Sequence, residues 1–400
     1  MGPFRTLYID MNSFFASVEQ QLDPSLRGRP VAITAMEKPV GICVAASYEA
    51  KAFGVKTGTP VREARRLCPD IAFRPSRHRL YVRYNLAVAE VLDHHAELER
   101  IRSVDEFQMA LSGEATTLDG AARLVATLKA AVAAEVGPCL RFSAGIGPNH
   151  LLAKIAGKLE KPDGFQWLSP QNMPERLVHL ALDDLPGISG AMKARLERAG
   201  VHDIPALWRL DPRHARAIWR SVEGERFVRS LRGEPIPLLQ TRRGGFGNGK
   251  VLAPAFRDPR SAYLVSRWLV EKAASRLRHS GRVAASFSLY IAREGARSLR
   301  ARMSCTQSQD TAFFLRVNRQ LWRGLWPQLR GQRLVAIAVQ LGGVEYLERH
   351  NGDLLTALPA AERTGGEKVA VAVDFLNGRF GAGTVTWGVN IPHPGFFERG

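Results

Sequence analysis

Three carboxylates in this chain have the type and the surroundings that metal-assisted phosphoryl transfer requires. Asp10 ends the apolar run TLYID, which predicts a short buried strand, and Asp105 and Glu106 lie at a turn between two further predicted strands. If these strands share one sheet, the three side chains can meet at its edge. Two magnesium ions about 4 Å apart in such a cluster can activate an attacking oxygen and neutralise a leaving one. Taken singly, Asp10 could instead cap the next helix, and an Asp-Glu pair in a turn is usually only solvated.

One hydroxyl and two cations indicate phosphate-binding chemistry. Tyr48 and Lys51 are three residues apart and therefore lie on one face of the short helix predicted at YEAKAFG. Lys161 precedes Pro162 in a predicted turn, where its amine could act as a point charge. Together these groups could hold a triphosphate, although each one alone is by default a surface residue.

The run LPGISG at residues 185–190 predicts a tight glycine-containing turn between two helices. Such a turn presents backbone N–H groups outward and can grip a DNA phosphate without reading sequence. The residues that would do so are Gly187, Ile188, Ser189 and Gly190. A plain helix–helix turn is an equally good interpretation of this segment alone.

The charge of the chain points to a polyanionic partner. The formal net charge is +18, and residues 241–350 contain 20 Lys and Arg against 6 Asp and Glu, a net of +14. A solvated basic face explains scattered lysines better than this concentration of arginines, so nucleic acid is the expected partner. No apolar run approaches the ~18 residues of a membrane span, no signal-peptide pattern is present, and the four cysteines form no CxxC pair. We therefore expect a cytoplasmic protein with reduced thiols and no membrane partner.

The elements that must position these residues predict a mixed fold. Strands are expected at residues 6–10, on both sides of the EKP turn at 37–39, on both sides of Asp105-Glu106 and at 140–147. Helices are expected at residues 13–22, 48–54, 60–67, 80–95, 120–136 and 149–159. Because this order lacks a regular βαβ repeat, it favours an α+β layer over a parallel sheet.

The run KPDG at residues 161–164 marks a boundary. Residues 166–235 are expected to be almost wholly helical, and the Gly/Arg-rich run TRRGGFGNG at 241–249 is interpreted as a linker. Beyond it we expect a strand from residue 250, a helix at 262–281, two strands, a helix at 311–326 and a strand at 333–343. The last fifty residues contain one helix-like run, EKVAVAVDFLNGRFG, and a loose end.

These separate signals occur in the order of one known family. The chain resembles the Y-family, polymerase IV-like DNA polymerases, which copy past lesions. The resemblance rests on five motifs, namely YIDMNSFFASVEQ, VAASYEAKAFGVKTGTP, SVDE, SAGIGPNHLLAKIAGKLEKPDG and LPGISGAMKARLERAGV. Residues 242–345 are similar to the family's little finger at a lower level, so the resemblance covers roughly residues 5–345. Five motifs in register are far more specific than any one of them, and the structural alternatives lose most of their weight.

The resemblance implies roles for individual residues. It implies two Mg²⁺ ions held by the side chains of Asp10, Asp105 and Glu106 and by the backbone carbonyl of Met11. Phe15 matches the steric gate, the aromatic ring that stacks under the sugar and excludes a 2′-hydroxyl. The other residues that match the family's nucleotide contacts are Ser13, Phe14, Tyr48, Lys51 and Lys161. The hairpin residues 187–190 match the turn that binds the DNA backbone in the family.

Several positions depart from the family pattern. Asn12 stands where a second Asp is common, and FQMAL follows Glu106 in place of the usual Tyr/Phe-Leu-Asp. The other departures are Ala45 for Thr, Lys51 for Arg, His150 for Lys and Ser189 for the second hairpin glycine. Together they suggest weaker nucleotide binding or a divergent branch, and not a loss of the chemistry.

The family's fold is a right hand, so the resemblance implies an α+β palm, small fingers, a helical thumb with a helix-hairpin-helix and an α/β little finger. The implied boundaries are residues 1–10 and 75–165 for the palm, 11–74 for the fingers, 166–235 for the thumb, 242–345 for the little finger and 346–400 for a C-terminal tail.

The implied function is template-directed DNA polymerisation of the lesion-bypass type. Such an enzyme adds deoxynucleotides to a primer 3′ end by two-metal phosphoryl transfer, with low fidelity and without proofreading. The implied partners of a monomeric bacterial enzyme are primer-template DNA and deoxynucleoside triphosphates. A sliding clamp is a further class of partner in the family, although the chain has no clear copy of the clamp-binding peptide. The rival interpretation is a non-catalytic, family-like DNA-binding scaffold that recruits another polymerase, and the presence of all three carboxylates argues against it.

Overall fold

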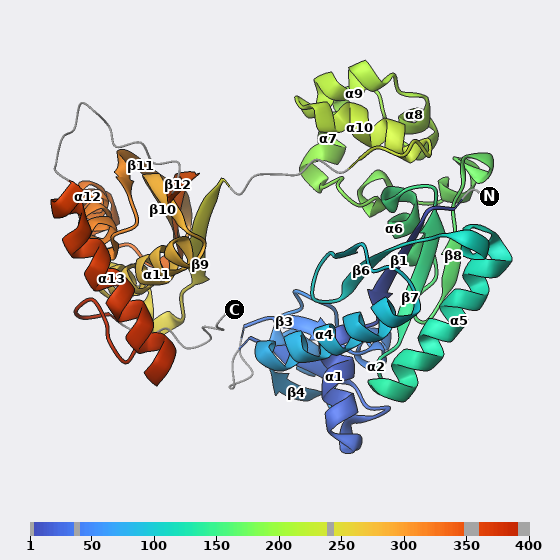
Figure 1. Cartoon of the computed structure of the whole chain (residues 1–400), viewed down its shortest axis with the longest axis horizontal. Helices are drawn as coiled ribbons and strands as arrows, with labels where there is room; N and C mark the ends of the chain where they lie inside the picture. The colour runs from blue at the N-terminus through green and yellow to red at the C-terminus, as the bar shows by residue number, and fades with distance from the viewer. Residues whose placement is uncertain (1–3, 36–40, 238–243, 348–359, 391–400) are drawn as a thin grey trace. The chain divides into compact units, whose positions relative to one another are not determined.

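The computed structural model describes residues 4–35, 41–237, 244–347 and 360–390. They divide into two compact units, Met1–Leu238 and Leu239–Phe396 (Figure 1). The EKP turn expected at 37–39 lies outside the described residues. Within the described part of the chain, no helix combines the length and the apolar character that crossing a bilayer requires.

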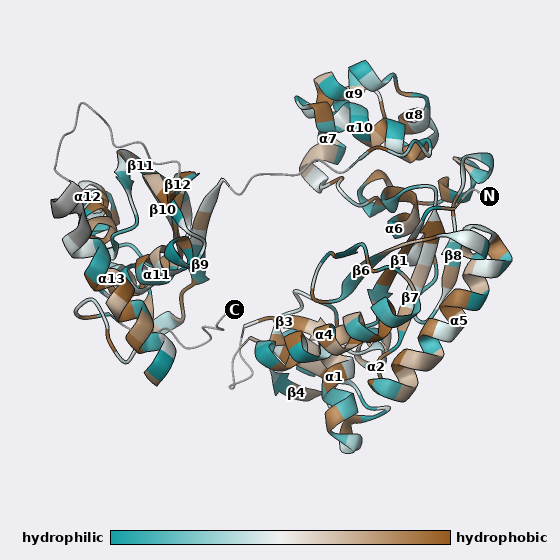
Figure 2. Cartoon of the chain, in the orientation of Figure 1, coloured by the Kyte–Doolittle hydropathy of each residue, from teal (hydrophilic) through white to brown (hydrophobic). Residues whose placement is uncertain are grey.

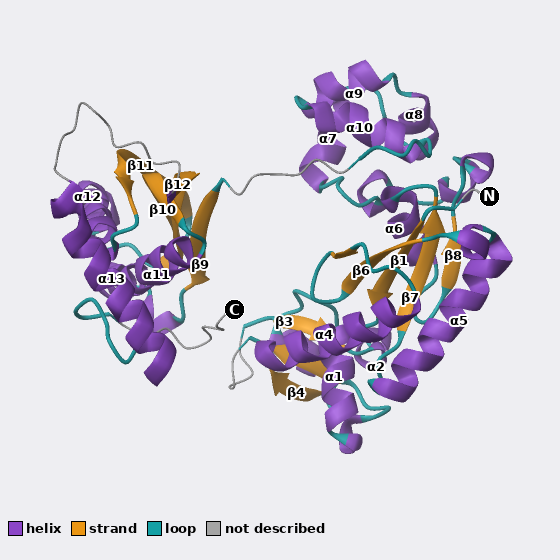
Figure 3. Ribbon diagram, in the orientation of Figure 1, coloured by secondary structure: helices purple, strands orange, loops and turns teal. Residues whose placement is uncertain are grey.

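The centre of the first unit is a five-stranded sheet in the order β5-β6-β1-β7-β8 (Figure 3). Its strands in that order are Arg100–Ile101, Glu106–Ala110, Thr6–Met11, Phe142–Gly147 and Phe165–Trp167. The central strand β1 is antiparallel to both neighbours, and β8 runs parallel to β7. We expected the thumb to begin at residue 166, but β8 includes Gln166 and Trp167 in this sheet. The three-residue strand β8 was missed because it is too short to show a period of its own.

Different helices pack against the two faces of this sheet. Leu7, Ile9 and Phe107 point into a core formed with α4 (His78–His95) and α5 (Leu118–Glu135). Figure 2 shows hydrophobic and hydrophilic residues side by side along α5, as an amphipathic helix requires. Since strand side chains alternate with period two, Tyr8 and Asp10 point to the other face.

The helix α6 (His150–Leu159) covers that second face. It lies very close to β7, and a Cβ atom added at Gly145 would stand 2.1 Å from the backbone nitrogen of Gly157. Only glycine fits such an approach. The close packing brings the polar side of α6 within reach of the β1 and β6 side chains that point the same way.

A smaller three-stranded sheet, β3-β2-β4, lies in the segment expected to form the fingers. Its strands are Cys43–Ala46, Val31–Thr34 and Ala72–Pro75, and the helices around it are α1 (Phe14–Leu22), α2 (Tyr48–Ala52) and α3 (Val61–Leu67). The strand β4 was not predicted. It pairs in parallel with β2 and is held by that partner, since its own four residues have no clear alternation. The strand β4 thus ends one residue beyond the expected boundary of the fingers at residue 74, and Met11, the first residue expected in the fingers, belongs to β1.

Four helices follow the sheet in the region expected to form the thumb. They are α7 (Gly190–Arg198), α8 (Ile204–Arg209), α9 (Pro212–Trp219) and α10 (Val222–Leu231). Each begins after a residue whose side chain accepts a backbone N–H of the first turn, and these caps are Ser189, Asp203, Asp211 and Ser221. Short 3-10 turns occur in the first unit at Pro24–Leu26, Gly113–Thr116, Pro170–Asn172, Glu175–Leu177 and Leu182–Asp184.

The second unit has a four-stranded sheet in the order β11-β10-β12-β9. These strands are Ala296–Ser308, Arg282–Arg293, Leu334–Tyr346 and Gly245–Val251, and the helices are α11 (Pro259–His279), α12 (Thr311–Leu329) and α13 (Ala360–Phe380), with a 3-10 turn at Pro254–Phe256. The helices α11 and α12 pack on one face of the sheet. The linker expected at 241–249 is wrong over its second half, because β9 begins at Gly245.

The C-terminal helix α13 packs against α11 and α12. The guanidinium of Arg278 in α11 donates to both carboxylate oxygens of Asp374 in α13, at 2.7 and 2.9 Å. It also donates to the carbonyl of Gln309 and to the hydroxyl of Thr311, both at 2.8 Å. The Arg278 side chain is only 5% exposed. Residues 360–390, which we expected to lie in a tail separate from the little finger, are therefore part of the second unit.

Replacing Arg278 with Met should destabilise the second unit. The change leaves the Asp374 carboxylate and two further acceptors without their donor, and breaking a buried ion pair in this way costs about 3–5 kcal/mol. Thermal and urea unfolding of the full chain would measure it. Arg330→Met, at an exposed position, is the control and should unfold like the wild type. Equal unfolding of both variants would show that this pair does not hold α13.

Candidate active site

The strand β1 places Asp10 beside the two other acidic residues. Asp10 pairs in register with Glu106 on β6 and with Ser143 on β7. The backbone N–H of Met11 donates to the carbonyl of Asp105 at 2.8 Å, which ties the end of β1 to the acidic turn. The strands that carry or flank the three acidic residues therefore share one sheet, and their backbones place these residues next to one another, as expected.

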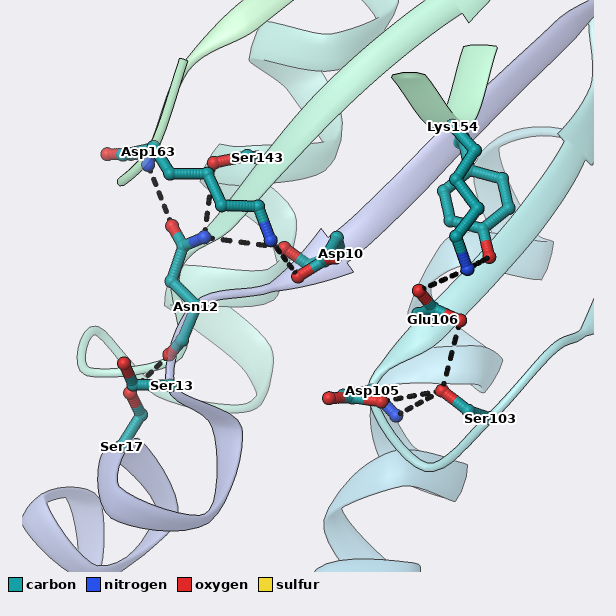
Figure 4. A network of polar contacts seen from close by, with 12 residues as sticks. Asp10, Asn12, Ser13, Ser17, Ser103, Asp105, Glu106, Ser143, Lys154 and Asp163 are labelled. Atoms are coloured by element: carbon teal, nitrogen blue, oxygen red, sulfur yellow. Dashed lines mark hydrogen bonds and ion pairs between the residues drawn. The ribbon is translucent and has the colours of Figure 1, made fainter. Parts of the chain in front are cut away.

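The hydroxyl of Ser103 contacts both neighbouring acidic residues, Asp105 in the turn and Glu106, which was expected in the turn but is the first residue of β6. It donates to Asp105 Oδ1 at 2.5 Å and lies 3.5 Å from Glu106 Oε2. Figure 4 shows Ser103 between the two carboxylates, with Lys154 reaching Glu106 from the other side. Ser103 is the first residue of the SVDE motif and was not among the predicted site residues.

One lysine in the middle of α6 and one just beyond the helix contact the carboxylates. Lys154 Nζ lies 2.6 Å from Glu106 Oε1 and 2.9 Å from the hydroxyl of Tyr8. Lys161 Nζ lies 2.5 Å from Asp10 Oδ1. Lys154 was missed, although Lys154, Lys158 and Lys161 are spaced four and three residues apart, which is the spacing of one helix face.

The protonation equilibria reflect this crowding of charge. Burial raises the pKa of the Asp10 carboxyl, the Lys161 ammonium opposes that shift, and the negative charges of Asp105 and Glu106 raise it further. Burial also acts to raise the pKa of Glu106, but the hydrogen bond and charge of Lys154 outweigh it, and the net shift is downward. The three acidic groups therefore share one electrostatic neighbourhood that favours bound cations.

The donor set fits magnesium, although the side chains do not already form a metal cage. Asp10, Asp105 and Glu106 offer hard oxygen atoms, the ligand type that magnesium prefers. Among the residues that the structure describes, no three His, Cys, Asp or Glu side chains are gathered closely enough to hold a metal ion. Ammonium groups contact two of the carboxylates, so this sheet edge already attracts positive charge.

Three of the residues expected on the triphosphate side, Ser13, Tyr48 and Lys51, are in contact with one another, whereas Lys161 contacts Asp10. Ser13, the N-cap of α1, has a left-handed backbone with φ of 49°. Its hydroxyl accepts a hydrogen bond from Lys51 Nζ at 2.8 Å, and the same ammonium lies 4.2 Å from the centre of the Tyr48 ring. Phe14 differs from these residues, because its side chain is buried in the sheet core and only its backbone can face a ligand.

Phe15 stacks on Tyr81 of α4, with ring centroids 4.2 Å apart and an interplanar angle of 15°. The Tyr81 hydroxyl donates to Glu19 Oε1 at 2.8 Å, and Arg77 forms an ion pair with the same buried carboxylate. A polar network therefore fixes the ring that lies behind Phe15. Glu19 and Tyr81 were not predicted, because α4 is distant in sequence from the motif that contains Phe15.

Two departures from the family pattern have structural roles of their own. The Asn12 side chain donates to the Ser143 hydroxyl at 3.1 Å and accepts the backbone N–H of Asp163 at 2.7 Å (Figure 4). It thereby ties the end of β1 to the turn that contains Lys161. Burial and the charges of Arg102 and Lys154 lower the pKa of His150 to about 4, so this imidazole is neutral at physiological pH.

The expected hairpin lies between the 3-10 turn Leu182–Asp184 and α7. Gly187 has a φ of +95°, and Ser189 caps the helix by accepting the N–H of Met192. A Cβ atom added at Gly190 would meet nothing within 4 Å, so the backbone there is open to a large ligand. Ile188 is buried in the core of the helical region and anchors the turn.

The second unit presents an open sheet face on the side away from α11 and α12. Arg300, Tyr290, Ala338 and Gly249 are aligned across its strands, and Arg302, Ser288, Gln340 and Gly247 form the next row. These residues line a shallow depression of about 580 Å³. Glycine at alternate positions of β9 leaves this edge flat, which suits a large and regular polyanion.

Comparison with known proteins agrees with this geometry. Residues 9–158 match the impB/mucB/samB family, and residues 243–354 match the C-terminal domain of that family. DNA polymerase IV of Pelotomaculum thermopropionicum is 31% identical over 98% of this chain and 97% of its own length. DNA polymerase IV of Moorella thermoacetica is 43% identical, over 50% of each chain.

Solved structures share the fold. A Y-family DNA polymerase chimera of Dbh and Dpo4 has a TM-score of 0.72 at 21% identity, over 86% of this chain and 99% of its own. DinB from Sulfolobus solfataricus has a TM-score of 0.52 at 21% identity, over 84% and 98%. The expected α+β right-hand fold is confirmed.

The first unit combines a mixed α/β sheet with a helical region, and the second unit has its own four-stranded sheet, which is the architecture of the solved Y-family polymerases. Together with a relative that matches along nearly its whole length, it identifies the chain as a member of the Y family of DNA-directed DNA polymerases, in the DinB-like branch.

Proposed function

We propose that the chain extends a primer 3′ end on a DNA template, past damaged bases, by two-metal phosphoryl transfer at Asp10, Asp105 and Glu106. The observation that carries the proposal is the register of Asp10 with Glu106, joined to Asp105 through Ser103. The primer 3′-oxygen would attack the α-phosphate of the nucleotide and pyrophosphate would leave. Two Mg²⁺ ions, which these carboxylates and the Met11 carbonyl would hold, would supply activation of that oxygen and neutralisation of the leaving pyrophosphate.

The other residues of the site position the nucleotide. Lys51, Tyr48 and Lys161 would bind the triphosphate, and Ser13 would present its backbone to it. Phe15 would lie under the sugar. Small fingers, here a three-stranded sheet and three short helices, leave room for a damaged template base, which supports low fidelity. We further infer that the hairpin 187–190 and the open sheet face of the second unit hold primer-template DNA through its phosphates.

The bacterial relatives support an enzyme that acts in the bacterial cytoplasm, and its deoxynucleotide substrates follow from the same relationship. Primer extension with Mg²⁺ on undamaged and lesion-containing templates tests the proposal directly. Extension past a lesion that stops a replicative polymerase supports it. DNA binding without any extension would favour the non-catalytic scaffold instead.

The open sheet face gives a quantitative prediction. Arg302→Ala should weaken binding to primer-template DNA by a similar factor for every sequence, because a phosphate contact carries no base information. The slope of log affinity against log salt should fall by about one unit for each phosphate that the variant no longer neutralises. Fluorescence anisotropy over a range of salt concentrations would measure both effects.

The control for that experiment is Arg330→Ala, which removes the same charge from the exposed C-terminal end of α12. Arg330→Ala should change the DNA affinity and the salt slope less than Arg302→Ala does. If Arg302→Ala keeps the wild-type slope, the open sheet face is not the DNA interface.

A further inference from the structure

An open cavity of about 470 Å³ lies between the end of α6 and the segment that precedes α7. Its polar lining consists of Lys158, Lys161, His179 and Asp184, and its walls are otherwise apolar. Lys161 also contacts Asp10, so one wall of the cavity is shared with the carboxylate site. No residue of this cavity other than Lys161 has a part in the proposed reaction.

Among the described residues that line the cavity, Lys158 is the lysine without an ion pair. Lys154 is paired with Glu106, and Lys161 is paired with Asp10. Lys158 stands one helical turn after Lys154, and within the described residues it has neither an ion pair nor a hydrogen bond. The Asp184 carboxylate already accepts the backbone N–H of Ala181 at 2.8 Å. The lining therefore offers positive charge to a small anion.

The size and position of the cavity restrict that anion. A volume of about 470 Å³ admits a small ligand and excludes a duplex. Two lysines three residues apart can contact two phosphoryl groups of one molecule. Nucleotide transfer at the adjacent carboxylates would release a molecule of this kind.

We propose that this cavity is an exit site for inorganic pyrophosphate. Lys158 is its principal cation, and Lys161, which lies between the carboxylate site and the cavity, binds the anion as it leaves. His179 stands at its opposite wall, on the segment before α7. The proposal rests on the proposed function and goes beyond it, because Lys158 and His179 belong to none of the expected nucleotide contacts.

Direct binding of inorganic pyrophosphate tests the site without any reaction. Calorimetry on the full chain in metal-depleted, low-salt buffer is the suitable measurement, because the bare carboxylates then repel the anion from the catalytic edge. Lys158→Met should bind pyrophosphate roughly fivefold more weakly, a modest loss for an exposed charged contact. Lys158→Arg, which keeps the charge, should bind within about twofold of the wild type.

The control is Lys56→Met, which removes one exposed charge from the fingers and should leave the affinity unchanged. Because Lys158 is itself exposed, the substitution should not unfold the protein. Equal affinities of wild type and Lys158→Met, or equal losses in Lys158→Met and Lys56→Met, would overturn the proposal.

Steady-state extension distinguishes an exit site from a site for the triphosphate tail of the incoming nucleotide. In Lys158→Met, the constant for product inhibition by pyrophosphate should rise by about the same factor as the calorimetric affinity falls, and by more than KM for the nucleotide. An equal rise in KM would assign the cavity to the nucleotide and overturn the exit role. A wild-type chain that binds pyrophosphate but extends no primer would refute the proposed function and leave the anion site in place.

Discussion

Glu106→Ala is expected to reduce nucleotide incorporation by on the order of 10³-fold or more, and Asp105→Ala by a similar factor. A metal ligand supplies several kcal/mol of charge stabilisation to the transition state, and each 1.36 kcal/mol corresponds to a factor of ten in rate. DNA binding should persist, because the basic sheet face that would hold the duplex belongs to the other unit. Single-nucleotide insertion under enzyme excess would measure the loss.

The controls separate chemistry from folding. Glu114→Ala removes a carboxylate that is 88% exposed and should extend primers at the wild-type rate. Glu106→Ala leaves Lys154 without its carboxylate partner, so a thermal melt must accompany the kinetics. A folded Glu106→Ala protein that extends primers like the wild type would show that these carboxylates are not the metal ligands.

The sequence predicted those parts of the fold that have a period of their own. The strand that ends in Asp10, the strand at 142–147 and the amphipathic helices α4, α5 and α6 were found because their apolar residues recur at strand or helix spacing. The short strands β4 and β8 were not found. Four or three residues show no periodicity, and such strands exist because a longer neighbour offers hydrogen bonds.

The linker at 241–249 shows why composition alone can mislead. The Gly/Arg-rich run was interpreted as a linker between domains, but Gly245, Gly247 and Gly249 form part of β9. A Cβ atom added at Gly245 would lie 2.7 Å from the carbonyl oxygen of Leu341, and at Gly247 it would lie 3.1 Å from that of Val339. Contact with the neighbouring strand requires these glycines, and a single sequence does not reveal that contact.

The residues of the candidate site also fall into a group that the sequence predicted and a group that it did not. Motif spacing predicted the three carboxylates, Lys51 and Lys161 as site residues, because they lie in short runs of recognisable sequence. Lys154, Tyr81 and Glu19 are positioned by packing between elements that are far apart in sequence. The lysine spacing along α6 was visible, but its meaning depends on Gly145, which lets that helix approach the sheet closely enough for lysines to reach the carboxylates.

Phe15→Ala is expected to raise the ratio of ribonucleotide to deoxyribonucleotide incorporation by about two orders of magnitude. As a gate, the Phe15 ring would fill the space that a 2′-hydroxyl needs, so a ribonucleotide must shift from in-line geometry, and such a misplacement can cost on the order of 100-fold in rate. The Tyr81 ring stacks on Phe15 with the ring centroids 4.2 Å apart, so the Phe15 side chain cannot easily adopt another rotamer. Insertion kinetics with matched ribo- and deoxyribonucleotides would measure the ratio.

The alternative role for Phe15 is an ordinary core aromatic, and it predicts a different outcome. Truncation of a core phenylalanine costs about 3–5 kcal/mol of stability and leaves sugar preference unchanged. Phe14, which is 3% exposed, is the residue of this pair that has such a core position. Phe15 is half-buried, so Phe15→Ala should stay folded, with a smaller shift in the thermal melt than Phe14→Ala gives.

Tyr81→Phe completes the experiment, because it keeps the stacked ring and removes only the hydroxyl that donates to Glu19. If Phe15 acts by excluding the 2′-hydroxyl, this variant should retain the wild-type sugar ratio, whereas Tyr81→Ala should relax it by allowing the Phe15 ring to retreat. A folded Phe15→Ala protein with an unchanged sugar ratio would refute the gate. A relaxed ratio in Phe15→Ala and Tyr81→Ala, but not in Tyr81→Phe, would establish that sugar selection depends on two rings held in place by stacking.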